Sequence, residues 1–288
     1  MKKNVNKLRR VLIIGSGGFI SSALEKNFTK DNIKYVGIKR SKFDLTKNTT
    51  VKKLSKLIKK KDIIIFIAAQ APVKNEEMLI NNIKMIKTFV DAIKQKLPSY
   101  ILYVSSDAVY SDSMGRIKET SPVEPKSLHG IMHYTREIIL RNSFKGKLCI
   151  VRPTLVYGKD DPHNGYGPNQ FVKLSNKKKD IKIFGNGEEQ RDHIWVEDIA
   201  FLIKKLLLLK KEGVYNLVTG RVMSFKKIAE IVKADKSNKK NIKIVKVKRN
   251  APMPHNGWRA FDNSKIKKVL PKFKFKKFIE VLHLMKNN

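Results

Sequence analysis

Two histidines four residues apart, His129 and His133, lie in the segment HGIMHYTRE and are well placed to do chemistry. An unperturbed imidazole titrates near pH ~6.5, so such a side chain can accept or donate a proton at neutral pH. Together with Glu137 the pair also falls on one face of a helix, a spacing that metal sites use. Because no independent third ligand accompanies the histidines, the sequence favours proton chemistry, and we predict no metal site.

A second candidate site lies near the start of the chain, in IIGSGGFISS, where Gly15 and Gly18 follow an apolar run. Glycines between a strand and a helix let a dinucleotide pyrophosphate approach backbone N–H groups and the positive end of the helix dipole. Ser21 stands where a third glycine would ease packing of the helix. The order of strand, turn and helix predicts a dinucleotide site made by Gly15, Ser16, Gly18, Phe19 and Ile20.

Lys39 and Arg40 follow the second apolar run, YVGI, where an NAD-specific fold places an acid that binds the ribose hydroxyls. A positive pair suits a 2′-phosphate instead. We therefore expect NADP(H) as the cofactor. NAD(H) is the alternative, in which case the two residues simply belong to a lysine-rich surface.

These residues need a scaffold, and the apolar pattern predicts one. Short β-branched runs indicate strands, and the stretches between them have helical spacing, as Leu79, Ile83, Ile86 and Val90 show. Alternating strands and helices predict an α/β fold of the Rossmann type, a doubly wound parallel sheet with ligands at the carboxyl ends of its strands. The predicted strands are 10–15, 34–38, 62–69, 100–106 and 147–153, and the predicted helices are 19–30, 51–60, 78–96 and 129–142.

The pattern loosens after residue 158 into a loop rich in glycine and proline, GKDDPHNGYGPNQF. We place a cofactor-binding Rossmann domain at 1–158 and a smaller, interleaved C-terminal substrate region at 159–191 and 220–288. Residues 192–219 contain a further helix and strand that we expect to return to the first domain.

Bulk composition narrows the class of protein. The 288 residues carry a formal net charge of +37, but the lysines are scattered in short runs and are not interleaved with aromatics, so we predict no nucleic-acid partner. No apolar run approaches the roughly 20 residues that cross a bilayer, and the N-terminal run lacks a signal-peptide cleavage site. The single cysteine, Cys149, lies in an apolar run and fits a reducing, cytoplasmic location.

Seven motifs follow one another along nearly the whole chain, and RDHIWVEDIA is the most specific of them. They are GSGGFIS, DIIIFIAAQ, Asn82 in the following helix, YVSSDAVY, VRPTLVYG, RDHIWVEDIA and YNLVTGRVMSFKKIAEI. In this order they resemble the extended short-chain dehydrogenases/reductases, the NAD-dependent epimerase/dehydratase family that modifies nucleotide sugars.

The resemblance implies roles for further residues. Those that would line the dinucleotide, from the adenine to the nicotinamide, are Asp44, Leu45, Ala68, Ala69, Gln70 and Pro153. The implied substrate is a nucleotide sugar, and arginine forks suit its diphosphate. The residues that would contact it are Asp107, Tyr110, Asn169, Arg191 and Arg259.

The catalytic residues are implied in the same way. Ser106 matches the family's catalytic Ser or Thr, whose hydroxyl binds the reacting sugar oxygen. The family also uses Tyr-x-x-x-Lys on a helix, and alignment on Gly130 and Glu137 puts His129 and His133 at these two positions. We favour an enzyme in which His129 is the acid/base and His133 holds the cofactor ribose. The alternative is a regulatory protein of the same fold that binds cofactor and nucleotide sugar with weak or no redox activity.

The implied reaction is reversible hydride transfer at a sugar carbon, leading to epimerisation or to reduction of a keto-sugar. Dehydratase members usually follow the acid at 107 with Glu, whereas Ala108 stands here, which argues against 4,6-dehydration. Related enzymes often dimerise through two helices, so 78–96 and 129–142 are the candidates for a homodimer interface.

Overall fold

The computed structural model describes residues 10–112, 115–235 and 242–286, and the chain forms two compact units. Unit 1 contains the described residues up to Ser111, Glu119–Pro153 and Ile199–Leu217. Unit 2 contains Asp112–Lys118 where described, Thr154–Asp198, and Val218 to the end of the described chain. Residues 154–158 and 192–198 therefore group with unit 2, whereas the sequence pattern placed them with the first domain.

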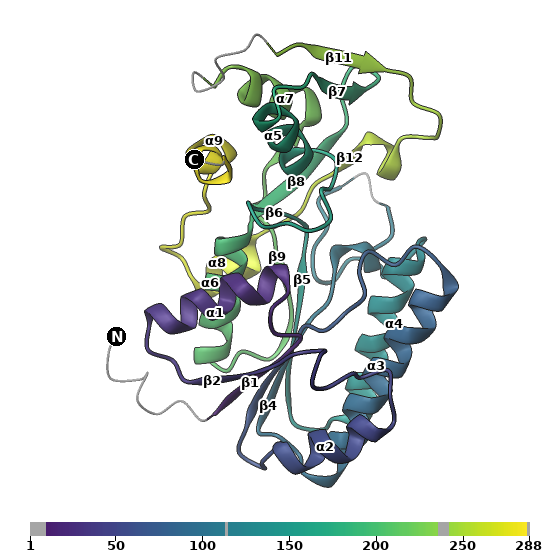
Figure 1. Ribbon diagram of the computed structural model, residues 1–288, viewed down its shortest axis with the longest axis vertical. Helices are drawn as coiled ribbons and strands as arrows, with labels where there is room; N and C mark the ends of the chain where they lie inside the picture. Colours follow the sequence, from purple (N-terminus) through teal and green to yellow (C-terminus); the bar gives the residue numbers. More distant parts are fainter. Residues whose placement is uncertain (1–9, 113–114, 236–241, 287–288) are drawn as a thin grey trace. The chain divides into compact units, whose positions relative to one another are not determined.

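Unit 1 is built on a six-stranded parallel sheet in the order β2-β1-β3-β4-β5-β9 (Figure 1). The chain leaves β1 toward β2 on one side and reaches β3 on the other, so the strand order reverses between β1 and β3. The predicted Rossmann-type α/β fold is confirmed, and so is the return of a late strand to the sheet. The strands are β1 Val11–Ile14, β2 Tyr35–Ile38, β3 Ile63–Phe66, β4 Tyr100–Val104, β5 Lys147–Pro153 and β9 Gly213–Leu217.

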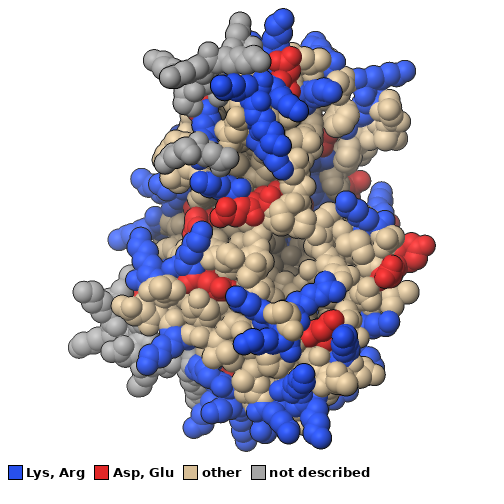
Figure 2. Space-filling view, in the orientation of Figure 1, with Lys and Arg blue, Asp and Glu red and all other residues tan. Residues whose placement is uncertain are grey.

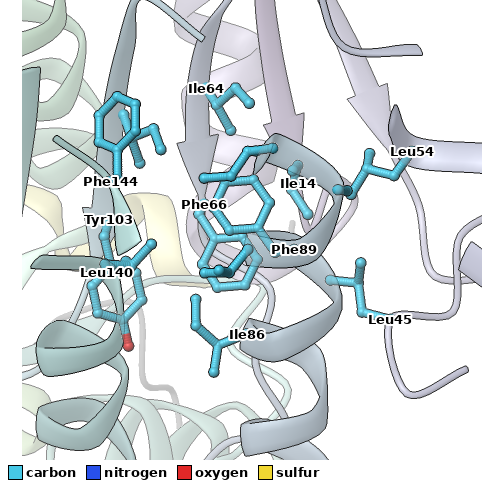
Figure 3. Close-up of a cluster of buried hydrophobic side chains, with 14 of the residues drawn as sticks. Ile14, Leu45, Leu54, Ile64, Phe66, Ile86, Phe89, Tyr103, Leu140 and Phe144 are labelled. Carbon is cyan, nitrogen blue, oxygen red and sulfur yellow. The ribbon is translucent and has the colours of Figure 1, made fainter. Parts of the chain in front are cut away.

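Helices cover both faces of this sheet (Figure 1). On one face α2, α3 and α4 pack on the strands through a large apolar cluster that includes Ile14, Phe66, Phe89 and Leu140 (Figure 3). On the other face α1 and α6 are joined by the buried Lys204, whose ammonium lies 2.8 Å from an Asp31 carboxylate oxygen. The helices are α1 Phe19–Lys30, α2 Thr49–Leu57, α3 Glu76–Gln95, α4 Leu128–Ser143 and α6 Val196–Leu208.

The strands form where the sequence is continuously apolar, because both faces of the sheet are covered. Val11–Ile14 and Ile63–Phe66 are buried at every position. The third strand is shorter than the predicted 62–69. After Phe66, the Ile67 and Ala68 N–H groups both donate to Ile14 O at 2.9 Å, so the chain turns away from the ladder at the end of β1.

Unit 2 consists of short strands and helices around a second apolar cluster, which includes Tyr157, Phe171, Trp195 and Phe225. Strands β10, β8 and β12 form one sheet, β6 also pairs with β8, and β7 pairs with β11. The strands are β6 Leu155–Tyr157, β7 Ile181–Phe184, β8 Gln190–Trp195, β10 Val222–Ser224, β11 Ile244–Val247 and β12 Trp258–Arg259. The helices are α5 Pro168–Asn176, α7 Phe225–Lys233, η3 Pro254–Gly257, α8 Ser264–Val269 and α9 Phe278–Met285.

The surface carries many basic side chains. Figure 2 shows lysines and arginines spread over the visible face, with acidic side chains between them. In the described parts of the chain, no helix has the length and apolar character that a membrane span requires.

Candidate active site

The turn between β1 and α1 has the geometry that a phosphate cradle requires. Gly15 has a φ of +101°, and a Cβ at this position would lie 2.6 Å from Ala68 N, so no side chain fits. Ser21 ties the turn together: its hydroxyl accepts from Gly18 N at 2.8 Å and donates to Gly15 O at 2.9 Å. Helix α1 begins directly after Gly18, so its first N–H groups form the positive end of the helix dipole. This turn contains the predicted phosphate-binding residues Gly15, Ser16, Gly18, Phe19 and Ile20.

Lys39 and Arg40 are exposed in the turn that follows β2. This turn lies against the glycine turn, because Gly15 N donates to Ile38 O at 3.0 Å. A Cβ on Gly17 would lie 3.9 Å from Lys39 Cε. The Lys39 side chain therefore lies beside the glycine turn, where its charge attracts an anionic ligand.

Asp44 and Leu45 are held in place by local contacts. The Asp44 carboxylate accepts hydrogen bonds from the Thr46 hydroxyl at 2.7 Å and from Thr46 N at 3.0 Å. These bonds, with a smaller contribution from the charge of Arg40, lower the pKa of Asp44. The Leu45 side chain is buried in the apolar cluster, so only its main chain can face a ligand.

The loop after β3 is held from two helices. Asn82 of α3 is fully buried; its side chain accepts from Gln70 N at 3.0 Å and donates to Gln70 O at 2.9 Å. Arg136 of α4 donates to Ala68 O at 2.9 Å. The predicted residues Ala68, Ala69 and Gln70 thus lie on a fixed loop at the β1/β3 switch point, where ligands of doubly wound sheets bind.

Ser106 lies in the turn that follows β4. Its hydroxyl caps the 3₁₀ turn η2, Asp107–Val109, by accepting from Ala108 N at 3.1 Å. The turn packs against α4, and a Cβ on Gly130 would overlap Ala108 O, so glycine is needed for this close approach. Since His129 precedes Gly130, the structure brings the predicted catalytic Ser106 and His129 to neighbouring elements. Asp107 is half-buried in the same turn.

The two histidines contact each other. Their ring centroids are 4.7 Å apart with an interplanar angle of 88°, an edge-to-face arrangement. His129 is half-buried, whereas His133 is only 5% exposed, and its Nδ1 lies 2.8 Å from the Tyr103 hydroxyl. Burial, and then the charges of His129 and Arg136, hold the pKa of His133 well below its usual value. His133 is therefore neutral at physiological pH.

Glu137 shares the helix face of the histidines. Its side chain is fully buried, and its carboxylate is hydrogen-bonded to neighbouring side chains. Its carboxylate accepts from the Ser105 hydroxyl at 2.6 Å and from Arg152 Nε and Nη2 at 2.9 and 2.6 Å. A carboxylate bound in this way orients β5 against α4 and is already used in a buried ion pair. Across the described ranges, no group of three or more His, Cys, Asp and Glu side chains is arranged to hold a metal ion.

Tyr110 belongs to the same buried network. Its hydroxyl donates to Asn216 Oδ1 at 2.7 Å, and its ring centroid lies 4.6 Å from Arg152 Cζ. Burial raises the pKa of Tyr110. Pro153 is buried at the end of β5. Tyr110, like His133, is thus a predicted ligand-contacting residue of unit 1 with a polar atom that is bound inside the core.

Unit 2 brings two predicted substrate residues together. Arg191 on β8 and Arg259 on β12 are partners in a parallel ladder, and both are buried. Arg191 donates to Glu189 at 2.5 Å and to Pro254 O at 2.8 Å. Arg259 donates to Asp112 at 3.3 Å. Each guanidinium is thus positioned by a carboxylate.

Asn169, the third predicted substrate residue of unit 2, lies in the first turn of α5. Its side chain accepts from Gly158 N at 3.0 Å and donates to Asp161 at 2.6 Å, which fixes the loop after β6. Asn169, Asp161 and Lys173 are among the residues that line a cavity of about 270 Å³. The cavity lies within unit 2.

Several residues of the site have no signal in the sequence. Tyr103 lies within an apolar strand, and Arg136 looks like a surface charge on a helix. Glu189 is near Arg191 in the sequence, but only the fold brings Arg249 to Glu189 and Asp112 to Arg259. Asn82 is the exception, because it belongs to the motif set.

The fold, the glycine turn and the fixed loops around it define a dinucleotide-binding α/β protein. Residues 11–217 match the sequence family described as the NAD dependent epimerase/dehydratase family. This chain belongs to that family.

Individual proteins agree with this assignment. The chain is 23% identical over 221 residues to an uncharacterized UDP-glucose epimerase, YtcB of Bacillus subtilis, covering 66% of this chain and 69% of that protein. Among solved structures it resembles a UDP-N-acetylglucosamine 4-epimerase from Methanobrevibacter ruminantium in complex with UDP-N-acetylmuramic acid (TM-score 0.80, 22% identity, 97% of each chain). It also resembles RMD from Pseudomonas aeruginosa complexed with NADPH (TM-score 0.80, 16% identity, 96% of this chain and 97% of that chain).

Proposed function

We propose that this protein transfers hydride reversibly at a carbon of a nucleotide-activated sugar, leading to epimerisation or to reduction of a keto-sugar. Membership of an NAD-dependent epimerase/dehydratase family supports an enzyme and disfavours a non-catalytic binding protein. One observation carries the proposal. The rings of His129 and His133 at the start of α4 are in contact, with their centroids 4.7 Å apart, and they lie next to the turn that Ser106 caps. These are the positions at which the family resemblance places the proton-transferring residue, at 129, and the residue that holds the cofactor ribose, at 133.

The roles follow from the chemistry of each group. The Ser106 oxygen accepts from Ala108 N, so its own proton is free to be donated to the reacting sugar oxygen. His129 takes the sugar hydroxyl proton as hydride leaves and returns it in the reverse direction. A neutral imidazole does this at physiological pH without an adjacent cation, whereas a tyrosine would need its pKa lowered. General acid–base catalysis of this kind contributes about 10²- to 10⁴-fold to the rate.

The cofactor is a nicotinamide dinucleotide, which would accept and return the hydride. The residues present fit such a group, because Gly15 adopts a φ of +101° and packs directly on the Ala68 main chain, which makes the tight turn that leads into the N-terminus of α1, where N–H groups can bind a pyrophosphate. We favour NADP(H) over NAD(H), since Lys39 and Arg40 stand after β2 and can pair with a 2′-phosphate. We also propose that His133 donates a hydrogen bond to the cofactor ribose.

The substrate is a nucleotide sugar whose diphosphate we assign to Arg191 and Arg259, positioned as neighbours in one ladder, and to Asn169. Asp107 would face the sugar. Ala108 argues against a 4,6-dehydratase, because a second acid is missing at that position. We further propose a cytoplasmic protein, in keeping with the buried Cys149, which forms no disulfide.

We also propose that the protein is a homodimer through α3 and α4. Each of these helices leaves large apolar side chains exposed: Ile80 on α3, and Ile131 and Ile138 on α4. Exposed isoleucines on adjacent helices favour burial against a second copy.

Titration of the full chain with NADPH and NADH, followed by fluorescence, tests the cofactor. A screen of UDP-, GDP-, CDP- and dTDP-sugars, with nicotinamide absorbance and product chromatography as readouts, tests the reaction. His129→Ala should lower turnover by about 10²- to 10⁴-fold while the NADPH affinity stays nearly intact. His283→Ala, on the exposed face of α9, is the matched control and should behave as wild type.

Three results would contradict the proposal. Binding of neither cofactor would leave only the fold. Tight cofactor binding without turnover on any nucleotide sugar would support the non-catalytic alternative. Wild-type turnover in His129→Ala would show that this histidine is not the acid/base.

A further inference from the structure

Tyr103 connects the core of unit 1 to the histidine pair. It lies on β4 with 0% of its surface exposed, and its ring centroid is 5.9 Å from that of Phe66 in the apolar cluster. Figure 3 shows its hydroxyl oxygen pointing away from the other labelled side chains. That oxygen lies 2.8 Å from His133 Nδ1. A buried hydroxyl therefore contacts a buried imidazole at its Nδ1 atom.

The direction of this hydrogen bond follows from the partners available. Burial is the main influence on the phenol and raises the pKa of Tyr103, so the hydroxyl keeps its proton. The side chains of Arg136 and Ser105 also interact with the phenol, but a guanidinium can only donate, and the hydrogen bond to His133 Nδ1 at 2.8 Å provides an acceptor for the hydroxyl proton. The opposite assignment, with Nδ1–H donating to the phenol, would aim two donors, Nδ1–H and the Arg136 guanidinium, at one buried phenol oxygen, which is unfavourable. Tyr103 therefore donates and His133 Nδ1 accepts.

We propose that Tyr103 is a positioning residue that fixes His133 as a neutral imidazole carrying its proton on Nε2, so that His133 presents one N–H donor in place of a lysine ammonium. The tautomer follows from the contacts of Tyr103 alone. That the donor serves the cofactor ribose rests on the proposed function.

The charges around His133 favour the same neutral state. From its own helix, His129 and Arg136 act on the imidazole, and both lower its pKa. From β4 it meets only the phenol of Tyr103, which carries no charge. Arg136 is fully buried, and its hydrogen bonds go to the main-chain carbonyls of Asn82 and Ala68. A protonated His133 would stand near this fixed cation, which is unfavourable in a buried site.

The test is a two-bond ¹H–¹⁵N correlation spectrum of the full chain labelled with [¹⁵N]histidine, recorded over roughly pH 6 to 8, the range in which ordinary histidines titrate. His133→Gln assigns the signals. We expect the wild-type His133 to show a protonated Nε2 and an unprotonated Nδ1 throughout. Tyr103→Phe should release this state, giving a mixture of tautomers or a titrating ring.

Tyr100→Phe is the matched control. Tyr100 lies on the same strand with 1% exposure, and its hydroxyl donates to Lys211 O at 2.6 Å, away from the histidines. Its removal should leave the His133 spectrum unchanged. If Tyr103→Phe does not fold, the wild-type spectrum still decides the tautomer.

A second measurement links the tautomer to function. Loss of the oriented donor in Tyr103→Phe should weaken NADPH binding by on the order of 10-fold, with no such effect in Tyr100→Phe. A wild-type His133 protonated on Nδ1, or a Tyr103→Phe spectrum equal to wild type, would overturn the inference. If the tautomer is as expected but the chain binds neither NADPH nor NADH, the proposed function fails while the assignment of Tyr103 stands.

Discussion

Replacing His193 with Phe should make unit 2 less sensitive to acid. His193 lies on β8, and both of its ring nitrogens are buried without a hydrogen-bond partner among the residues that the structure describes. Its ring packs edge-on against Phe225, with centroids 5.6 Å apart. Burial lowers the pKa of His193 to about 3. A phenyl ring keeps the aromatic packing and removes the titrating group.

The sign and size of the effect follow from proton linkage. The unfolded chain protonates this histidine near its ordinary pKa of about 6.5, whereas the folded chain resists protonation down to about 3. Stability is therefore fully present above roughly pH 6.5 and is lost as the pH falls toward 3. Between about pH 7 and pH 5 the loss is roughly 2 kcal/mol, and across the whole window it is roughly 5 kcal/mol.

Urea unfolding at these two pH values measures the difference. Both tryptophans of the chain, Trp195 and Trp258, belong to unit 2, so their fluorescence follows the unit that contains His193. The decrease in unfolding free energy from pH 7 to pH 5 should be smaller in His193→Phe than in wild type by roughly 2 kcal/mol. The control His283→Phe changes an exposed histidine of the same unit and should keep the wild-type decrease. Equal acid sensitivity in wild type and His193→Phe would refute this account of the buried imidazole.

Three further changes give distinct outcomes. Gly15→Ala places a Cβ 2.6 Å from Ala68 N at a φ of +101°, and strain of about 1–3 kcal/mol should weaken NADPH binding about 10- to 100-fold in a fluorescence titration. The double variant Lys39→Ala with Arg40→Ala should weaken NADPH binding by about 10-fold and leave NADH binding almost unchanged; equal losses for both cofactors would argue against NADP(H). Burial raises the pKa of Asp198 to about 6, so the carboxylate destabilises the fold as the pH rises from roughly 4 to 6. Asp198→Asn should therefore be more stable than wild type by up to about 3 kcal/mol near pH 8 in urea unfolding, and the gain should vanish near pH 4.

The sheet of unit 1 was predictable because each of its strands is buried on both faces and leaves a continuous apolar run, as in Val11–Ile14. The strands of unit 2 have a weaker hydrophobic pattern in the sequence. Ile181–Phe184 alternates between buried and exposed positions, and Val222–Ser224 is only half-buried. Segments as short as these depend on their partners, such as β8 for β10, and partners are not visible from local sequence.

The candidate site likewise has one part that the local sequence predicts and one part that depends on contacts between distant segments. The glycine turn is local, so its residues lie together in sequence and the strand–turn–helix order reveals them. Tyr103 and His133 are 30 residues apart, and nothing in the apolar run ILYVSS marks its tyrosine as the one that meets a histidine. That contact depends on how β4 lies against α4, where the Ser105 hydroxyl directly after β4 donates to Glu137 of α4 at 2.6 Å. The sequence therefore predicted the histidine pair but not the group that orients it.

The histidine at position 133, where the family resemblance implies a lysine, and the burial of Arg136 can be linked physically. Arg136 is one turn further along α4 and fully buried, and in the described chain it interacts with the main-chain carbonyls of Asn82 and Ala68 and with the phenol of Tyr103, none of which is a carboxylate that would cancel its charge. A lysine at position 133 would place a second cation close to it in the same buried region, where like charges repel strongly. A neutral imidazole with an Nε2–H keeps one hydrogen-bond donor there without a second charge. The cost is the loss of a cation that could lower the pKa of a catalytic tyrosine, and that cost disappears when the acid/base at position 129 is itself a histidine.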